Sequence, residues 1–150
     1  MEKNINFEKF IKEKSNLVCS KFFIENFIDF YNIKRIEKIN DNEIQFEFQF
    51  IPNEKYANFL NIVHGGSITL TFDNLINLCL YYSTNSFFRH ISFSIIYKNQ
   101  VLLNEKYIIK ILLERLQFKT VFITCILLNE KKVKCIEAQI IKEKKLINKM

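Results

Sequence analysis

Glycine is almost absent from this sequence. Its 150 residues contain two, Gly65 and Gly66, which stand side by side directly after His64. A glycine is needed where the backbone must reach a positive φ, or where another group must come close to the main chain. The pair precedes a long apolar run over 67–82 and therefore marks a backbone requirement at the start of a buried element.

Proline and uninterrupted apolar runs are also scarce. Pro52 is the only proline, and no Pro- or Gly-rich linker divides the chain, so we expect a single domain over 1–150. Polar residues interrupt the 67–82 run before it reaches the roughly 20 residues of a membrane span, which predicts no membrane span. The acidic, non-apolar start predicts no secretory signal and favours a cytoplasmic over a mitochondrial location.

Metal-binding and nucleic-acid-binding patterns are missing as well. The four cysteines show no CxxC spacing and only two histidines are available, so we expect no metal site, no cofactor and reduced core cysteines. The net charge is +6, but the lysines are spread along the chain rather than clustered. We therefore expect no nucleic-acid partner.

Hydrophobic periodicity predicts the order of the elements. Residues 7–31 show helical spacing with an interruption near 15–16. Strands are expected at 33–39, 43–51, 90–97, 105–116, 119–128 and 133–142, and a long helix at about 66–82. This order predicts an α+β fold, with an antiparallel sheet wrapped around one central helix.

The long helix is apolar on nearly all sides, which is typical of a helix covered by other elements. Its polar exceptions, Thr69, Asp73 and Asn77, fall four residues apart and form one stripe. In the strand that follows, alternation puts His90, Ser92 and Ser94 on one face.

These residues suit chemistry on a carbonyl group. Free N–H groups of Gly65 and Gly66 at a helix start can stabilise a developing negative charge. Asp73, in an apolar helix, is expected to be partly desolvated and hence more basic; it could activate water or attack directly.

The arrangement Asn58, five residues, His64-Gly65-Gly66, six residues, Asp73-Asn74 resembles the signature of the hotdog-fold acyl-CoA thioesterases, notably the thioesterase superfamily member 2 and phenylacetate-pathway types. The similarity runs from about residue 33 to 142 and includes the segment 91–97. The resemblance implies a hotdog core over 33–142, preceded by an extra N-terminal helical segment over 1–31.

The resemblance also implies an activity, hydrolysis of a fatty or aryl acyl-CoA thioester to the free acid and coenzyme A. Asn58 and the Gly65 N–H would polarise the carbonyl while Asp73 activates water. Asp73 would face Asn58 and His64 of the partner subunit, in a homodimer or a dimer of dimers. His64 is expected to shape the turn rather than to exchange protons.

The remaining site assignments are supporting ones. A Ser or Thr often supports the acid in this family, and here His90 or Ser92 occupies that place. Gly66 and Lys98 are candidates for substrate binding, Lys98 because coenzyme A carries phosphates.

Two other functions are compatible with such a fold. A non-catalytic acyl-CoA-binding or assembly subunit would keep the fold without turnover, and the unusual His90 is the feature in its favour. A hotdog dehydratase or hydratase is disfavoured, because no His-Phe-Pro sequence occurs.

Overall fold

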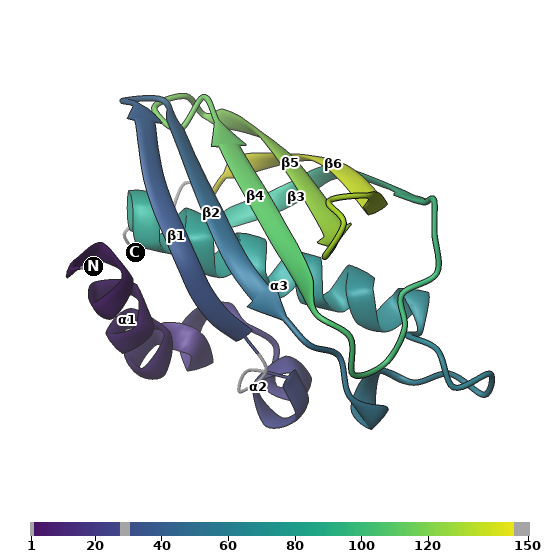
Figure 1. Cartoon of the computed structure of the whole chain (residues 1–150). Helices are drawn as coiled ribbons and strands as arrows, with labels where there is room; N and C mark the ends of the chain where they lie inside the picture. The colour runs from purple at the N-terminus through teal and green to yellow at the C-terminus, as the bar shows by residue number, and fades with distance from the viewer. Residues whose placement is uncertain (1, 28–30, 146–150) are drawn as a thin grey trace.

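The computed structural model describes residues 2–27 and 31–145 (Figure 1). Three α-helices, one 3-10 turn and six strands follow one another in these ranges. Their bounds are α1 Glu2–Val18, α2 Lys21–Phe27, β1 Tyr31–Asn40, β2 Glu43–Phe50, η2 Glu54–Tyr56, α3 Gly65–Thr84, β3 Phe88–Tyr97, β4 Tyr107–Glu114, β5 Thr120–Asn129 and β6 Lys134–Lys144.

The strands form one sheet in the order β1-β2-β4-β5-β6-β3, and each neighbouring pair is antiparallel. Alternate residues of the central strands are fully buried, as Ile109, Ile111 and Leu113 of β4 show. Because successive side chains of a strand point to opposite faces, these residues form one apolar face. Helix α3 runs across that face (Figure 1), so the predicted α+β architecture is confirmed.

Helix α3 is covered on most sides, as its apolar circumference predicts. Most of its large apolar side chains, among them Ile68, Phe72 and Leu75, have no exposed surface. The helix ends at Asn85, whose φ of 51° and ψ of 37° give the left-handed C-cap that asparagine tolerates. Neither α3 nor another helix in the described ranges is long and apolar enough to cross a membrane.

The N-terminal helical segment is interrupted at Cys19–Ser20, four residues beyond the expected place. The backbone N–H of Ser20 donates to Asn74 Oδ1 (2.8 Å), and its hydroxyl accepts from the N–H of Phe23 (3.2 Å). Ser20 thus caps the start of α2 while tying the chain to α3. Residues 28–30, where the helical prediction continued, lie outside the described residues, and Tyr31 already belongs to β1.

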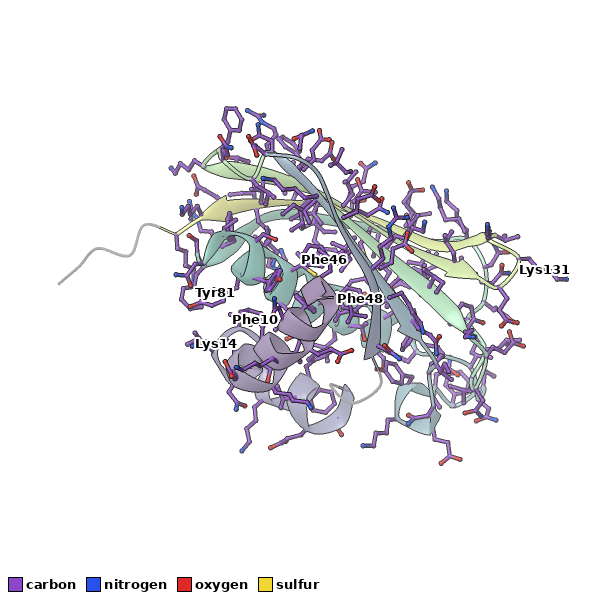
Figure 2. The ribbon with its side chains drawn as sticks, turned by 60° about the vertical axis from the view of Figure 1, so that its left-hand side comes forward. Phe10, Lys14, Phe46, Phe48, Tyr81 and Lys131 are labelled. Carbon is purple, nitrogen blue, oxygen red and sulfur yellow. The ribbon has the colours of Figure 1, made fainter. Side chains whose placement is uncertain are left out.

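Helix α1 packs through aromatic side chains. Phe7 is fully buried and makes an edge-to-face contact with Tyr82 of α3, with ring centroids 4.8 Å apart. It also meets Phe46 and Phe48 of β2 at 5.4 and 5.9 Å. Figure 2 shows Phe10 and Tyr81 in the same region, where their rings stack at 6.0 Å. Helix α1 therefore closes one side of the core.

A β-bulge interrupts β3 between His90 and Ser92. The prediction that His90, Ser92 and Ser94 share one face is therefore wrong. The extra residue shifts the alternation, so His90 lies with Phe93 on the face toward α3, whereas Ser92 and Ser94 lie on the opposite face.

We expect Phe7→Ala to lower the free energy of unfolding by about 3–5 kcal/mol, because it opens a cavity among buried rings. Urea denaturation would measure the change. Leu17→Ala is the matched control in the same helix, since the Leu17 side chain is 53% exposed and its truncation should cost less than about 0.5 kcal/mol. Equal midpoints for the two variants would show that α1 does not pack as described.

Candidate functional site

His64 caps the start of α3. Its φ of −72° and ψ of 131° are extended, and its Nδ1 accepts the N–H of Gly66 at 3.0 Å. The backbone N–H of His64 in turn donates to the carbonyl of Tyr56 (2.7 Å). A Cβ added at Gly66 would lie 2.9 Å from the imidazole, so the second glycine is needed for this cap. The expected turn-shaping role of His64 agrees with these contacts.

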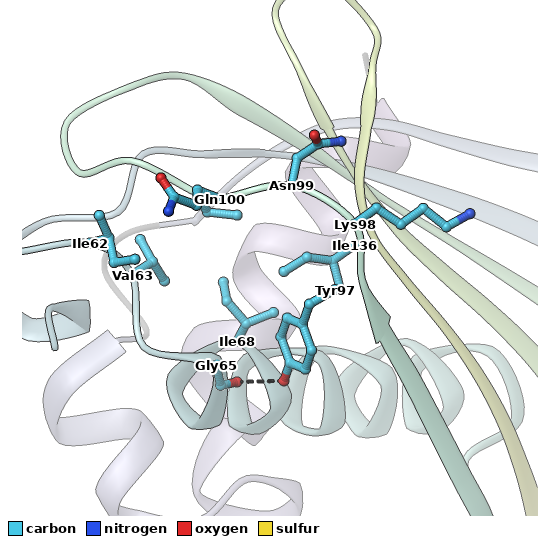
Figure 3. A pocket seen from close by; sticks show the side chains of 10 residues that line it. Ile62, Val63, Gly65, Ile68, Tyr97, Lys98, Asn99, Gln100 and Ile136 are labelled. Carbon is cyan, nitrogen blue, oxygen red and sulfur yellow. Dashed lines mark hydrogen bonds between the residues drawn. The ribbon is translucent and has the colours of Figure 1, made fainter. Parts of the chain in front are cut away.

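Gly65 is the residue with an available amide. Its N–H has no hydrogen-bond partner among the described residues, whereas the Gly66 N–H is taken by His64. Neither glycine has a positive φ. The glycine pair is therefore needed because other groups come close to the main chain. A Cβ at Gly65 would lie 3.2 Å from the ring of Tyr97. The Tyr97 hydroxyl also donates to the Gly65 carbonyl at 2.9 Å (Figure 3).

A cavity of about 320 Å³ adjoins Gly65. Its apolar walls include Ile62, Ile68 and Ile136, which Figure 3 shows around the opening. Lys98 also lines it, but the side chain extends away from Gly65 in Figure 3 and its Nζ donates to Glu137 at 2.8 Å. The ammonium group of this lining residue is thus paired with a carboxylate.

Asn58 organises the loop that leads to His64. Its Oδ1 accepts the N–H groups of Leu60 (2.9 Å) and Ile62 (3.2 Å), which is the turn-capping arrangement. The side-chain Nδ2 has no partner among the described residues and is left as a donor.

The Asp73 carboxylate is the centre of a polar cluster. Its Oδ1 lies 2.6 Å from Nε2 of His90 on β3 and 2.9 Å from Nζ of Lys142 on β6. The Asp73 side chain is 32% exposed and that of His90 41%. Both border a pocket of about 450 Å³ together with Gly66, Thr69, Leu70 and Phe93. The carboxylate therefore meets an ammonium and an imidazole in a partly exposed position.

Lys142 is the functional candidate that the sequence analysis missed. Its side chain is 1% exposed, and its Nζ also donates to Asn77 Oδ1 at 2.5 Å. Burial lowers the pKa of Lys142 below its ordinary value, and the neighbouring Asp73 opposes that shift. A signal was present: Ile136, Ala138 and Ile140 fill the buried face of β6, and position 142 continues it.

The polar stripe of α3 is confirmed by its contacts. Thr69 Oγ1 lies 2.8 Å from the Tyr97 hydroxyl, Asp73 meets His90 and Lys142, and Asn77 meets Lys142. Ser92, the other residue suggested to support Asp73, borders a separate pocket on the opposite face of the sheet, with Arg115 and Phe122. Of the two alternatives, the structure brings His90 to the acid.

Gly65 and Asp73 lie on one straight helix, eight residues apart. At 1.5 Å per residue this separates them by about 12 Å along the axis. The Gly65 N–H and the Asp73 carboxylate of one chain are therefore too far apart to contact the same small group.

No protein-family model matches this sequence, and no curated protein matches it significantly. Several solved structures are similar to this chain. Thioesterase superfamily member 2 from mouse superposes with a TM-score of 0.71 at 13% identity, over 93% of this chain and 96% of that one. The zebrafish member gives 0.68 at 16%, over 93% and 94%.

Bacterial proteins are similar too. The PaaI protein of the phenylacetic acid degradation operon of E. coli gives a TM-score of 0.62 at 11% identity, over 95% of this chain and 99% of that one. The protein smu.793 from Streptococcus mutans, solved bound to acetyl-CoA, gives 0.66 at 16%, over 77% and 88%. At these identities the likeness establishes architecture. This chain has the fold of the hotdog thioesterases.

Proposed function

We propose that this protein is an acyl-CoA thioesterase. The proposal is carried by one observation: a carboxylate, Asp73, stands at the rim of a pocket with Oδ1 bound by His90 and Lys142, which leaves Oδ2 to meet water. The shared fold with thioesterases, one of them solved with acetyl-CoA, supports the same reading. The substrate class is a fatty or aryl acyl-CoA.

In the proposed reaction Asp73 removes a proton from water as the water oxygen attacks the thioester carbonyl carbon. The carbonyl oxygen gains negative charge, which the Gly65 N–H and Nδ2 of Asn58 stabilise, helped by the dipole of α3. The carbon–sulfur bond then breaks, and coenzyme A leaves as the thiolate. His90 supports the carboxylate, while Gly66 and His64 hold the backbone that presents the Gly65 amide.

The distance between Gly65 and Asp73 supports a site shared by two chains. Within residues 31–145 no strand pairs with the outer edge of β3, and this edge exposes Ile91 and Ile96 by 54% and 55%. Two such edges can pair around a two-fold axis, which removes an unprotected sheet edge. If the axis passes near Thr69, midway between the two residues, Gly65 of one subunit lies opposite Asp73 of the other.

Asp73→Asn tests the role of the carboxylate. The amide oxygen can still accept from Lys142, so the fold should persist, but an amide cannot take up the proton. We expect turnover to fall by about 10²–10⁴-fold, measured as free-thiol release from short, medium, long and aryl acyl-CoAs. If the native chain binds acyl-CoA without releasing thiol, the protein is instead a non-catalytic acyl-CoA-binding subunit of this fold.

Gly65→Pro tests the amide donor. Proline suits the first helical position, and the extended backbone of His64 is compatible with a following proline. Gly65→Ala is the matched control, because it adds the same Cβ beside Tyr97 and keeps the N–H. We expect Gly65→Pro to turn over about 10²–10³-fold more slowly than Gly65→Ala. Equal rates would remove the Gly65 amide from the mechanism.

Mixing two inactive variants tests the shared site. After Asp73→Asn and Gly65→Pro proteins are unfolded together and refolded, about half of the dimers should be mixed, each with one intact site, so about a quarter of native activity should return. Each variant refolded alone is the control. Recovery no greater than the sum of the controls would argue for a site contained in one chain.

A further inference from the structure

We propose that Lys142 is a positioning residue for Asp73: its buried ammonium group binds Oδ1 of the carboxylate and fixes its orientation, so that Oδ2 is presented to water. This rests on the proposed thioesterase function for its catalytic consequence. The structural part, a buried cation in contact with Oδ1 of Asp73, stands on geometry alone.

The place of Lys142 in β6 is unusual for a charged residue. Ile136, Ala138 and Ile140 occupy the buried face of the strand, each 1% exposed, and Lys142 follows at 1%. An apolar side chain at position 142 would continue this row of buried apolar residues. Replacing a buried ion pair by apolar side chains is often neutral or stabilising, so stability gives no reason for a lysine at this position.

The contacts of Lys142 fix the position of its ammonium group. Its Nζ meets Asp73 Oδ1 at 2.9 Å and Asn77 Oδ1 at 2.5 Å, two side chains one turn apart on α3. It is thereby anchored to the helix at two points. His90 approaches the same oxygen of Asp73 from β3 at 2.6 Å. Two strands thus hold one carboxylate oxygen, and the carboxylate cannot rotate freely.

The other groups around the cluster do not supply this charge. Cys19 lies near Asp73, and burial, assisted by the Asp73 charge, raises its pKa to about 12, which keeps the thiol neutral. Glu143, the next residue of β6, pairs with Arg89 and Lys119 instead. Lys142 is therefore the lysine that pairs with Asp73 among the described residues.

The sequence offers a direct test, because it contains three aspartates, Asp29, Asp41 and Asp73. Carboxyl-¹³C aspartate labelling gives three signals, and Asp73→Asn identifies the one from Asp73. We expect Lys142→Met to shift this signal at neutral pH, because the ammonium group no longer contacts Oδ1. Lys144→Met, which removes an exposed charge from the same strand, should leave it unchanged.

Kinetics test the consequence for catalysis. We expect Lys142→Met to lower kcat by about 10–100-fold with little change in KM, because a displaced carboxylate misplaces the water. In the Asp73→Asn background the same substitution should have no further effect, since Lys142 acts only through Asp73.

The outcomes separate the two proposals. An unchanged Asp73 signal in Lys142→Met overturns the inference, whatever the activity. A shifted signal in a protein that releases no thiol supports the contact between Lys142 and Asp73 and overturns the thioesterase function. A shifted signal with unchanged kcat overturns the positioning role of Lys142. If Lys142→Met does not fold, Lys142→Gln, which keeps a hydrogen-bond donor without the charge, gives the same comparison.

Discussion

The rest of this structure depends on how the strands meet the polar line of α3, a helix that is otherwise mostly apolar. Its apolar side chains fill the core, while Thr69, Asp73 and Asn77 lie along one line. Tyr97 and His90 of β3 and Lys142 of β6 meet that line. Because the buried ammonium group of Lys142 would be costly to leave without a hydrogen bond, its contacts with Asp73 and Asn77 fix how β6 lies against the helix.

At the start of α3, some backbone polar groups make structural hydrogen bonds and one amide is left as a donor. His64 uses the Gly66 amide for its cap, and Tyr97 uses the Gly65 carbonyl, so the Gly65 amide is left over. A helix start always has such surplus donors. Here the close packing of an imidazole and a phenol ring against the two glycines decides which donor remains, and the adjoining cavity gives a ligand access to it.

The same helix is the basis for the proposal of a site shared by two chains. It keeps the Gly65 amide and the Asp73 carboxylate apart, and among the described residues β3 has one edge without a partner strand. In the proposed dimer, a second copy related by a two-fold axis pairs with that edge and brings the amide of one chain opposite the carboxylate of the other. The N-terminal helices cover a different side, through Phe7 and the Ser20–Asn74 hydrogen bond, and so leave that edge accessible.

The sequence by itself determined the order and type of nearly all the elements, because periodicity and turn residues act over a few positions. The long helix, its polar stripe and the importance of the Gly65–Gly66 pair follow from such local patterns, and six strands were placed to within about two residues. Tertiary structure decided the rest. The bulge in β3 turned His90 toward Asp73 and Ser92 away from it, and Lys142 reached Asp73 from 69 positions along the chain. No local pattern specifies a contact of that range, since it depends on strand order, on register and on which face a bulge selects.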